Sequence, residues 1–196
     1  MARTDPKDDL RSYLQRARDA IVWKLDGLSE YDARRPMTPT GTNLLGLVKH
    51  LACCEAGYFG ETFGRPFPDD LSWLENGDRQ VDLWATADES REQIVDFYRR
   101  AWAHADATFD ALPLDAIGHV PWWPADRNQT ALHRVLVHMI AETERHAGHA
   151  DICREYIDGA VGLGAGRTNV PDQDADQWRE YYDKLERLAR QVAGTG

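Results

Sequence analysis

The sequence predicts an all-α protein, an up-down bundle of four long helices with an additional C-terminal helix. Three observations indicate this fold class. Apolar residues recur at spacings of three and four in five separate segments. Glycine and proline gather between those segments. No segment alternates apolar and polar residues over the length of an ordinary β-strand. The 196 residues are enough for one sizeable core, so we expect a single domain over residues 1–196.

The first helix is expected from Asp8 to about Leu28. Thr42 or Asn43 can cap the second helix, which ends before Gly64. Both segments place their apolar side chains on one face, as a helix packed in a bundle does. In the first segment these residues are Leu10, Leu14, Ala17, Ile21 and Leu25.

The third helix follows a long loop over residues 64–85. The run from Thr86 to Glu89 has the spacing of a capping box, and the helix that it opens continues toward Leu112 and is stopped by Pro113. After a second loop, Asn128 or Thr130 starts the fourth helix.

The fourth helix runs to Asp158, and Gly159 suits the position after a helix end. A fifth helix spans about residues 174–192 and has one apolar face. We expect the four long helices to alternate in direction, down-up-down-up, with the fifth packed on them.

The composition of the chain argues against several classes of function. The chain is 42% hydrophobic and 29% charged, which is typical of a globular protein. Its formal net charge of −10 argues against a nucleic-acid or anionic-membrane partner. There is no apolar run of membrane-spanning length and no apolar core of a secretion signal near the start, so we expect a cytoplasmic protein. The three cysteines, with Cys53 and Cys54 adjacent, are expected as reduced thiols.

The fourth helix carries the clearest chemical pattern. His138, Glu142, His146 and His149 follow one another at spacings of four, four and three. On a helix they lie within a stripe about 80° wide, because each residue turns the helix by about 100°. Imidazole and carboxylate groups are common ligands of divalent metals. Taken alone, the stripe fits a metal site and a structural histidine–glutamate hydrogen bond equally well.

The burial of two of these groups requires a partner, which is either a metal or a lysine or arginine from another helix. His146 points into the apolar face of the helix and Glu142 lies at its edge, whereas His138 and His149 lie farther toward solvent. An unpaired buried carboxylate costs several kcal/mol, on the order of its desolvation. A divalent cation would satisfy both groups.

A further ligand has to come from another helix. His50 is the candidate, because it lies in the middle of the second helix beside the apolar face, and Gly46 and Gly57 leave room for a neighbour to approach. His104 and His119 are the alternatives. Trp122 and Trp123, just before the fourth helix, either line the mouth of a pocket or plug one end of the bundle.

Three segments together resemble a known family. They are Leu-Leu-Gly-Leu-Val-Lys-His50-Leu, then Val-His-Met-Ile-Ala-Glu142-Thr-Glu-Arg-His146-Ala-Gly-His-Ala-Asp-Ile, and Arg-Glu-Tyr-Ile-Asp-Gly159. This pattern resembles the DinB-like (YfiT-like) superfamily of four-helix-bundle metalloenzymes. It is similar to the metal-binding domain of mycothiol-dependent maleylpyruvate isomerase, which uses a His–Glu–His set.

The resemblance implies a metal site. In the family, a histidine on helix 2 and two residues four apart on helix 4 hold a divalent metal, and the matching positions are His50, Glu142 and His146. Many members have histidine where this chain has Glu142. His149 is the alternative third ligand if Glu142 instead orients a histidine. Zinc is the metal we expect first, with nickel and manganese as alternatives.

The resemblance also implies a reaction. A metal with three protein ligands keeps a position for water or substrate and lowers the pKa of a bound water or thiol. Characterised relatives use a low-molecular-weight thiol such as mycothiol or bacillithiol. We therefore expect a metal-dependent, thiol-utilising transferase or isomerase that acts on a small electrophile. The alternative is a non-catalytic stress protein that binds a metal or a thiol adduct. A homodimer is a further expectation, because many bundles pair through helix faces.

Overall fold

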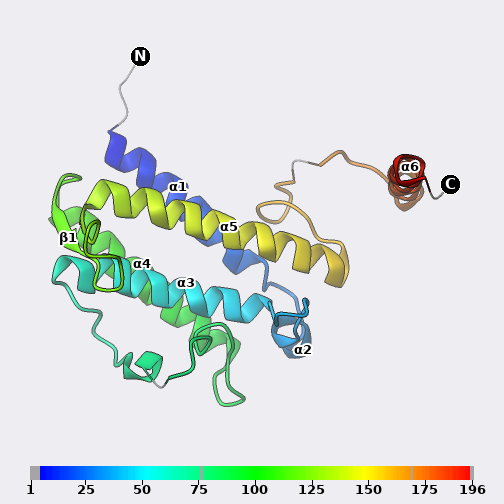
Figure 1. The fold of residues 1–196 in the computed structure, drawn as a ribbon. Coiled ribbons are helices and arrows are strands. Elements are labelled where there is room, and N and C mark those ends of the chain that lie inside the picture. Colours follow the sequence, from blue (N-terminus) through cyan, green and yellow to red (C-terminus); the bar gives the residue numbers. More distant parts are fainter. Residues whose placement is uncertain (1–4, 76, 169, 195–196) are drawn as a thin grey trace.

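The computed structural model describes residues 5–75, 77–168 and 170–194. The prediction of an all-α protein is confirmed. The four long helices are α1 (Pro6–Trp23), α3 (Leu44–Phe59), α4 (Arg91–Ala111) and α5 (Leu132–Asp158), and they lie side by side (Figure 1). Shorter elements connect them: α2 (Glu30–Arg34) and the 3-10 helices η1 (Glu61–Phe63) and η2 (Ser72–Glu75). The C-terminal helix is α6 (Ala175–Ala193).

The direction of the helices differs from the expected alternation, because α3 and α4 run parallel. The Thr108 hydroxyl near the end of α4 donates to the carbonyl of Phe59 at the end of α3. Lys49 in α3 pairs with Glu89 just before α4 begins. The prediction of strict alternation was wrong because the connection from α3 to α4, described for residues 60–75 and 77–90, runs back along the bundle (Figure 1). The direction of a loop leaves no periodic signal in a sequence.

Helix α1 runs parallel to α5 and antiparallel to the other pair. Near the start of α1, Lys7 donates to the carbonyls of Phe109 and Leu112 at the end of α4. Near the end of α1, Lys24 pairs with Asp151 in α5. The order of directions is therefore up-down-down-up.

Several helix ends follow the predicted signals, whereas α1 ends at Trp23, earlier than the predicted Leu28. Asn43 caps α3, and its side-chain oxygen accepts from the Gly46 amide. Gly159 ends α5 with a φ of 77°, a left-handed conformation that glycine adopts without strain. Helix α4 starts later than predicted. Its capping box is formed by Ser90 and Gln93, one turn beyond the expected Thr86–Glu89 box.

A small hairpin was not predicted. Strand β1 (Ile117–His119) pairs antiparallel with β2 (Gln129–Ala131), and α5 begins immediately afterwards at Leu132. The pairing takes up residues 129–131, so neither Asn128 nor Thr130 caps the helix. Strands of three residues are too short to show a period-2 pattern.

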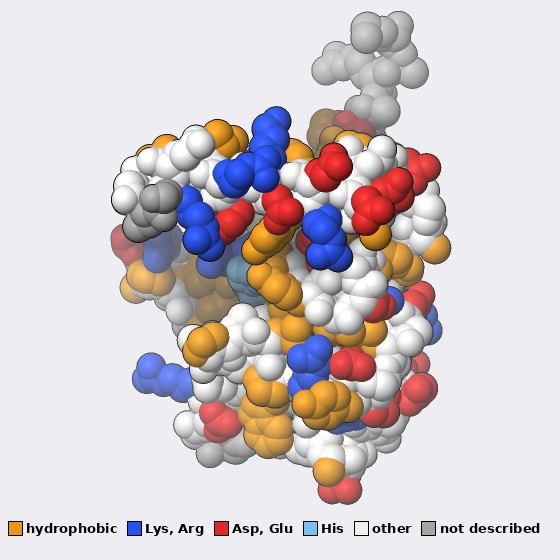
Figure 2. Space-filling model, turned by 90° about the vertical axis from the view of Figure 1, so that its right-hand side faces the viewer, with side chains coloured by type: hydrophobic (Ala, Val, Ile, Leu, Met, Phe, Trp, Pro, Cys, Tyr) orange, Lys and Arg blue, Asp and Glu red, His pale blue; other side chains and the backbone are white. Residues whose placement is uncertain are grey.

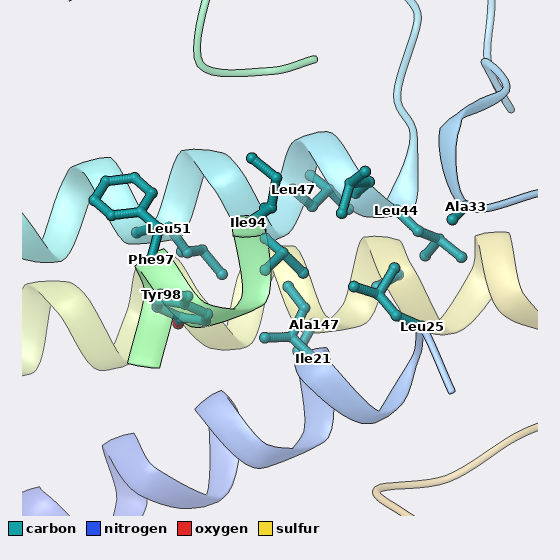
Figure 3. Packing of buried hydrophobic residues seen from close by; sticks show 14 of the residues in the cluster. Ile21, Leu25, Ala33, Leu44, Leu47, Leu51, Ile94, Phe97, Tyr98 and Ala147 are labelled. Atoms are coloured by element: carbon teal, nitrogen blue, oxygen red, sulfur yellow. The ribbon is translucent and has the colours of Figure 1, made fainter. Parts of the chain in front are cut away.

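The core is formed by the inner faces of the four long helices. Figure 3 shows Ile21 of α1 near Ile94 of α4 and Ala147 of α5, and Leu25, just after α1, near Leu44 of α3. A second cluster around Phe59 and the residues packed on it fills the other end of the bundle. Both clusters include residues of α3 and α5, so these two helices pack against each other in the core.

Helix α6 begins as predicted but does not pack as predicted. Asp174 caps it, with the Gln177 side chain completing the capping box. The expectation that this helix packs on the bundle was wrong. None of its described residues is buried, and Figure 1 shows it away from the other helices. Residues 159–168 and 170–174, between α5 and α6, lead the chain away from the end of α5. Among the described residues, no helix combines the length and apolar character needed to cross a membrane.

Candidate metal centre

The three residues that the sequence analysis selected come together between α3 and α5. His50 from α3 and Glu142 and His146 from α5 each offer a ligand atom, and these atoms lie within 4.8 Å of one another. The Glu142 Oε1 atom is 3.0 Å from Nε2 of His146 and 3.5 Å from Nε2 of His50. The two rings meet edge to face with their centroids 4.9 Å apart. Antiparallel packing of two helices thus creates one donor cluster from distant stretches of sequence.

The Nδ1 atoms of His50 and His146 also have partners. The Asp82 carboxylate lies 2.7 Å from Nδ1 of His50. Nδ1 of His149 lies 3.3 Å from Nδ1 of His146. These contacts leave both Nε2 atoms facing Glu142, which is the orientation that a shared cation requires. His149 therefore contacts the side of His146 that faces away from the cluster, and it is not among the three converging donors.

Asp82 comes from the long loop between α3 and α4, and no spacing in the sequence predicts its contact with His50. The loop reaches α3 because residue 46 is glycine. A Cβ atom at Gly46 would collide with the carbonyl of Leu83. The Asn43 side-chain amide donates to that same carbonyl at 3.0 Å. The glycine expected to leave room for a neighbour therefore accommodates the loop that carries Asp82.

The electrostatics of the cluster follow from its burial and mutual contacts. Burial lowers the pKa of His50, but the hydrogen bonds with Asp82 and Cys54 outweigh it and raise the pKa to about 11. Burial raises the pKa of Glu142, but His146 and His50 outweigh it, so the net shift is downward. Burial and the charge of His50 lower the pKa of His146. Near pH 7, Glu142 is ionised, His146 is neutral and His50 holds a proton.

The donor set suits a divalent cation. Two imidazole nitrogens and one carboxylate oxygen are ligands that zinc accepts, and three protein ligands keep a position open for a further one. Glu142 forms its ion-pair contacts with the two histidines, and no lysine or arginine pairs with it among the described residues. A cation would neutralise this half-buried carboxylate and replace the proton on His50.

The other candidate histidines lie elsewhere. His104 Nε2 is 2.6 Å from the carbonyl of Arg65, a structural contact. His119 is exposed on β1. The alternatives to His50 are therefore not near the cluster.

His138 contacts a different group. Its Nε2 atom lies 3.1 Å from the Tyr58 hydroxyl, which also accepts a hydrogen bond from the indole N–H of Trp123 at 3.0 Å. Because its oxygen accepts from Trp123, the Tyr58 hydroxyl can direct its own proton to His138 or into the adjacent cavity.

Two cavities reach the cluster from different sides. One of about 450 Å³ is lined by His50, Glu142, Tyr58, Cys54 and Trp122 among others. Another of about 410 Å³ reaches His146 and His149. In Figure 2 a histidine side chain is visible at the back of a hollow rimmed by hydrophobic and basic side chains. Of the two tryptophans before α5, Trp122 lines a cavity, as one of the two predicted alternatives has it. Trp123 instead donates a hydrogen bond to the Tyr58 hydroxyl.

The cysteines are free thiols, as predicted. The sulfur of Cys54 lies 3.5 Å from Nε2 of His50, inside the larger cavity. Cys53 is buried, and burial raises the pKa of its thiol, so it is a poor nucleophile.

A comparison with known protein families identifies the family of this chain. The family model for mycothiol-S-transferase matches residues 9–159, which include nearly all of α1, all of α3 to α5 and each of the three converging donors. A comparison with curated proteins gives no match. The match covers well over half of the chain and agrees with the resemblance to DinB-like proteins. The chain belongs to the mycothiol-S-transferase family.

Proposed function

We propose that this protein is a metal-dependent transferase that joins mycothiol to a small electrophile, with His50, Glu142 and His146 as the metal ligands. The observation that carries the proposal is the convergence of these three donors beside two cavities, in a chain of the mycothiol-S-transferase family. Zinc is the proposed metal, and nickel and manganese are the alternatives. A divalent cation in this position would lower the pKa of a bound thiol and so supply a thiolate near neutral pH.

The residues next to the three proposed metal ligands have different roles in this proposal. Asp82 and His149 hold the two imidazoles in the ligating orientation. Tyr58 and His138 face the larger cavity, where the Tyr58 hydroxyl can donate a hydrogen bond to the electrophile as negative charge develops on it. Trp122 supplies an apolar wall that limits the access of water to the reacting atoms.

The proposed reaction is a nucleophilic transfer. The S–H bond of the thiol breaks and its proton passes to solvent. The sulfur then uses its electron pair to form a bond to the electrophilic carbon. With an aryl chloride as acceptor, the carbon–chlorine bond breaks and its electron pair leaves with chloride.

The three free cysteines support the predicted cytoplasmic location, because reduced thiols are typical of that compartment. The homodimer stays a prediction.

The test uses protein purified without a histidine tag and loaded with zinc. Mycothiol and 1-chloro-2,4-dinitrobenzene are mixed with it, and the S-conjugate is followed by absorbance. We expect turnover in the wild type and a loss of at least about 100-fold in Glu142→Gln, with the circular dichroism spectrum unchanged. A wild type that binds mycothiol without turning it over would support the non-catalytic binding protein instead. Equal rates in the wild type and Glu142→Gln would rule out the metal-dependent mechanism.

A further inference from the structure

Helix α6 (Ala175–Ala193) lies outside the part of the chain that matches the family model, which ends at residue 159. The family therefore does not account for this helix. It stands away from the four long helices in Figure 1, and none of its described residues is buried. Most of the stability of an amphipathic helix comes from packing of its apolar face, so α6 requires a partner.

The apolar residues of α6 have the spacing of a coiled coil. They recur at alternating intervals of three and four residues, so they repeat every 3.5 residues on average and face a neighbouring helix along its length. We call them the α6 seam, and they are Trp178, Tyr181, Leu185, Leu188 and Val192. The last four of these side chains are between 47% and 92% exposed. The spacing indicates that the partner of α6 is another helix.

The charges on the molecule argue against two other occupants of the seam. Helix α6 contains four acidic and four basic residues, so it has no excess of positive charge for an anionic membrane. On the outer face of α5, the exposed apolar residues Val137 and Ile152 are separated by exposed charged residues. These are Glu144 and Arg145, and an α6 helix docked there would bury both charges.

The α6 helix of a second copy is complementary to the first. The positions that flank the seam contain one charged residue, since they are Gln177, Tyr182, Lys184, Ala189 and Gln191. Like charges at these positions would oppose the pairing of identical helices, whereas in a parallel pair Lys184 would face Ala189 of the second copy. A parallel pair in register also matches each seam residue with its own equivalent. Val192 and Leu188 occupy the two kinds of seam position in the combination that favours two strands.

We propose that α6 is an oligomerisation helix, whose seam pairs in parallel with the seam of a second copy to form a two-stranded coiled coil. The pair has two-fold symmetry and is closed, so association stops at the dimer. The seam covers only residues 178–192, so the dimer forms in a concentration-dependent equilibrium. This proposal concerns a different part of the chain from the metal centre and does not depend on the proposed function.

Two matched double variants of the full chain test the proposal. Leu185→Gln/Leu188→Gln places two glutamines in the seam, and Glu186→Gln/Arg187→Gln places two on the adjacent polar face. Leucine and glutamine have similar helix propensities, so the comparison isolates the seam. Sedimentation velocity over about 5 to 500 μM protein measures the dissociation constant of the dimer. We expect this constant to rise at least about tenfold in the seam variant and to stay within about twofold of the wild type in the control.

Cysteine cross-linking tests the parallel register. Parallel pairing places residue 185 of both copies in one layer, so Leu185→Cys should form a disulfide-linked dimer on oxidation with diamide. Asp183→Cys, on the polar face of the same helix, should not. The wild type serves as the control for the three native cysteines.

Three results would overturn the proposal. The first is a wild type that stays monomeric, whether α6 then folds back on its own bundle or binds another surface. The second is a seam variant that dimerises as the wild type does, because the dimer would then form through the bundle. The third is equal cross-linking of Leu185→Cys and Asp183→Cys.

Discussion

The carbonyl of Leu83 occupies the space that a Cβ atom on Gly46 would need, and this close approach places the neighbouring Asp82 against His50. The orientation of one proposed metal ligand thus depends on the absence of a side chain one turn earlier in α3. Gly46 thus allows the close approach of the loop, and the loop brings the Asp82 carboxylate to His50.

Gly46→Ala is therefore expected to weaken zinc binding by about tenfold or more, because the loop must move and Asp82 loses its contact with His50. The measurement is a chelator-competition titration of the metal-free protein. Gly148→Ala is the matched control. It lies in α5 with open space around the added methyl group, and it should leave zinc affinity unchanged while stabilising the helix slightly. Equal zinc affinity in both variants would contradict the role of Gly46.

Asp82→Asn tests the same contact more directly. The amide can still hydrogen-bond Nδ1 of His50 but carries no charge, so we expect the zinc affinity to fall about 10- to 100-fold with the fold retained. Asp115→Asn, at an exposed aspartate outside the site, serves as the control. If both variants bind zinc as the wild type does, Asp82 does not orient the ligand.

Metal binding should release a proton. In the metal-free protein the pKa of His50 is raised to about 11, so this ring is protonated at neutral pH. The pKa of Glu142 and that of His146 are both lowered, so Glu142 is ionised and His146 is a neutral imidazole there. Zinc binding at pH 7 should thus displace about one proton, from His50, and affinity should decrease as the pH falls. Calorimetry in two buffers of different ionisation enthalpy measures the release. A binding enthalpy independent of the buffer would contradict it.

A buried ion pair between α1 and α3 should contribute strongly to stability. Arg18 and Glu55 are both almost fully buried and share two hydrogen bonds between α1 and α3. Glu55→Ala removes the buried partner of the Arg18 guanidinium and leaves it only Gln15 and the partly exposed Asp106, so we expect the free energy of unfolding to fall by about 3–5 kcal/mol in a urea titration. The double variant Arg18→Met/Glu55→Leu should recover most of that loss. A change below about 1 kcal/mol in Glu55→Ala would show that the pair is unimportant for stability.

The features that the sequence predicted are those with a local periodic signal. His146 and Glu142 are one helical turn apart, so a shared face follows from the helix alone. The Asn43 cap and the Gly159 helix end also rest on neighbouring residues. His50 was selected from its helix face, and the resemblance to DinB-like proteins paired it with Glu142 and His146.

The features that the sequence did not predict depend on contacts between distant segments. Asp82 sits in an irregular loop, where no spacing distinguishes it from its acidic neighbours. The parallel course of α3 and α4 depends on how that loop crosses the bundle. The position of α6 has the same origin. Its apolar face predicts packing on the bundle, whereas the described residues of the preceding loop, 159–168 and 170–174, lead it away.

The most direct test of the central claim is the zinc content of untagged protein after zinc loading and exhaustive dialysis, measured by inductively coupled plasma mass spectrometry. We predict about one ion per chain in the wild type and less than about 0.1 in His50→Ala and in His146→Ala, both with wild-type helicity. Retention of the ion in these variants, or a wild type that holds none, would contradict a metal centre at these residues.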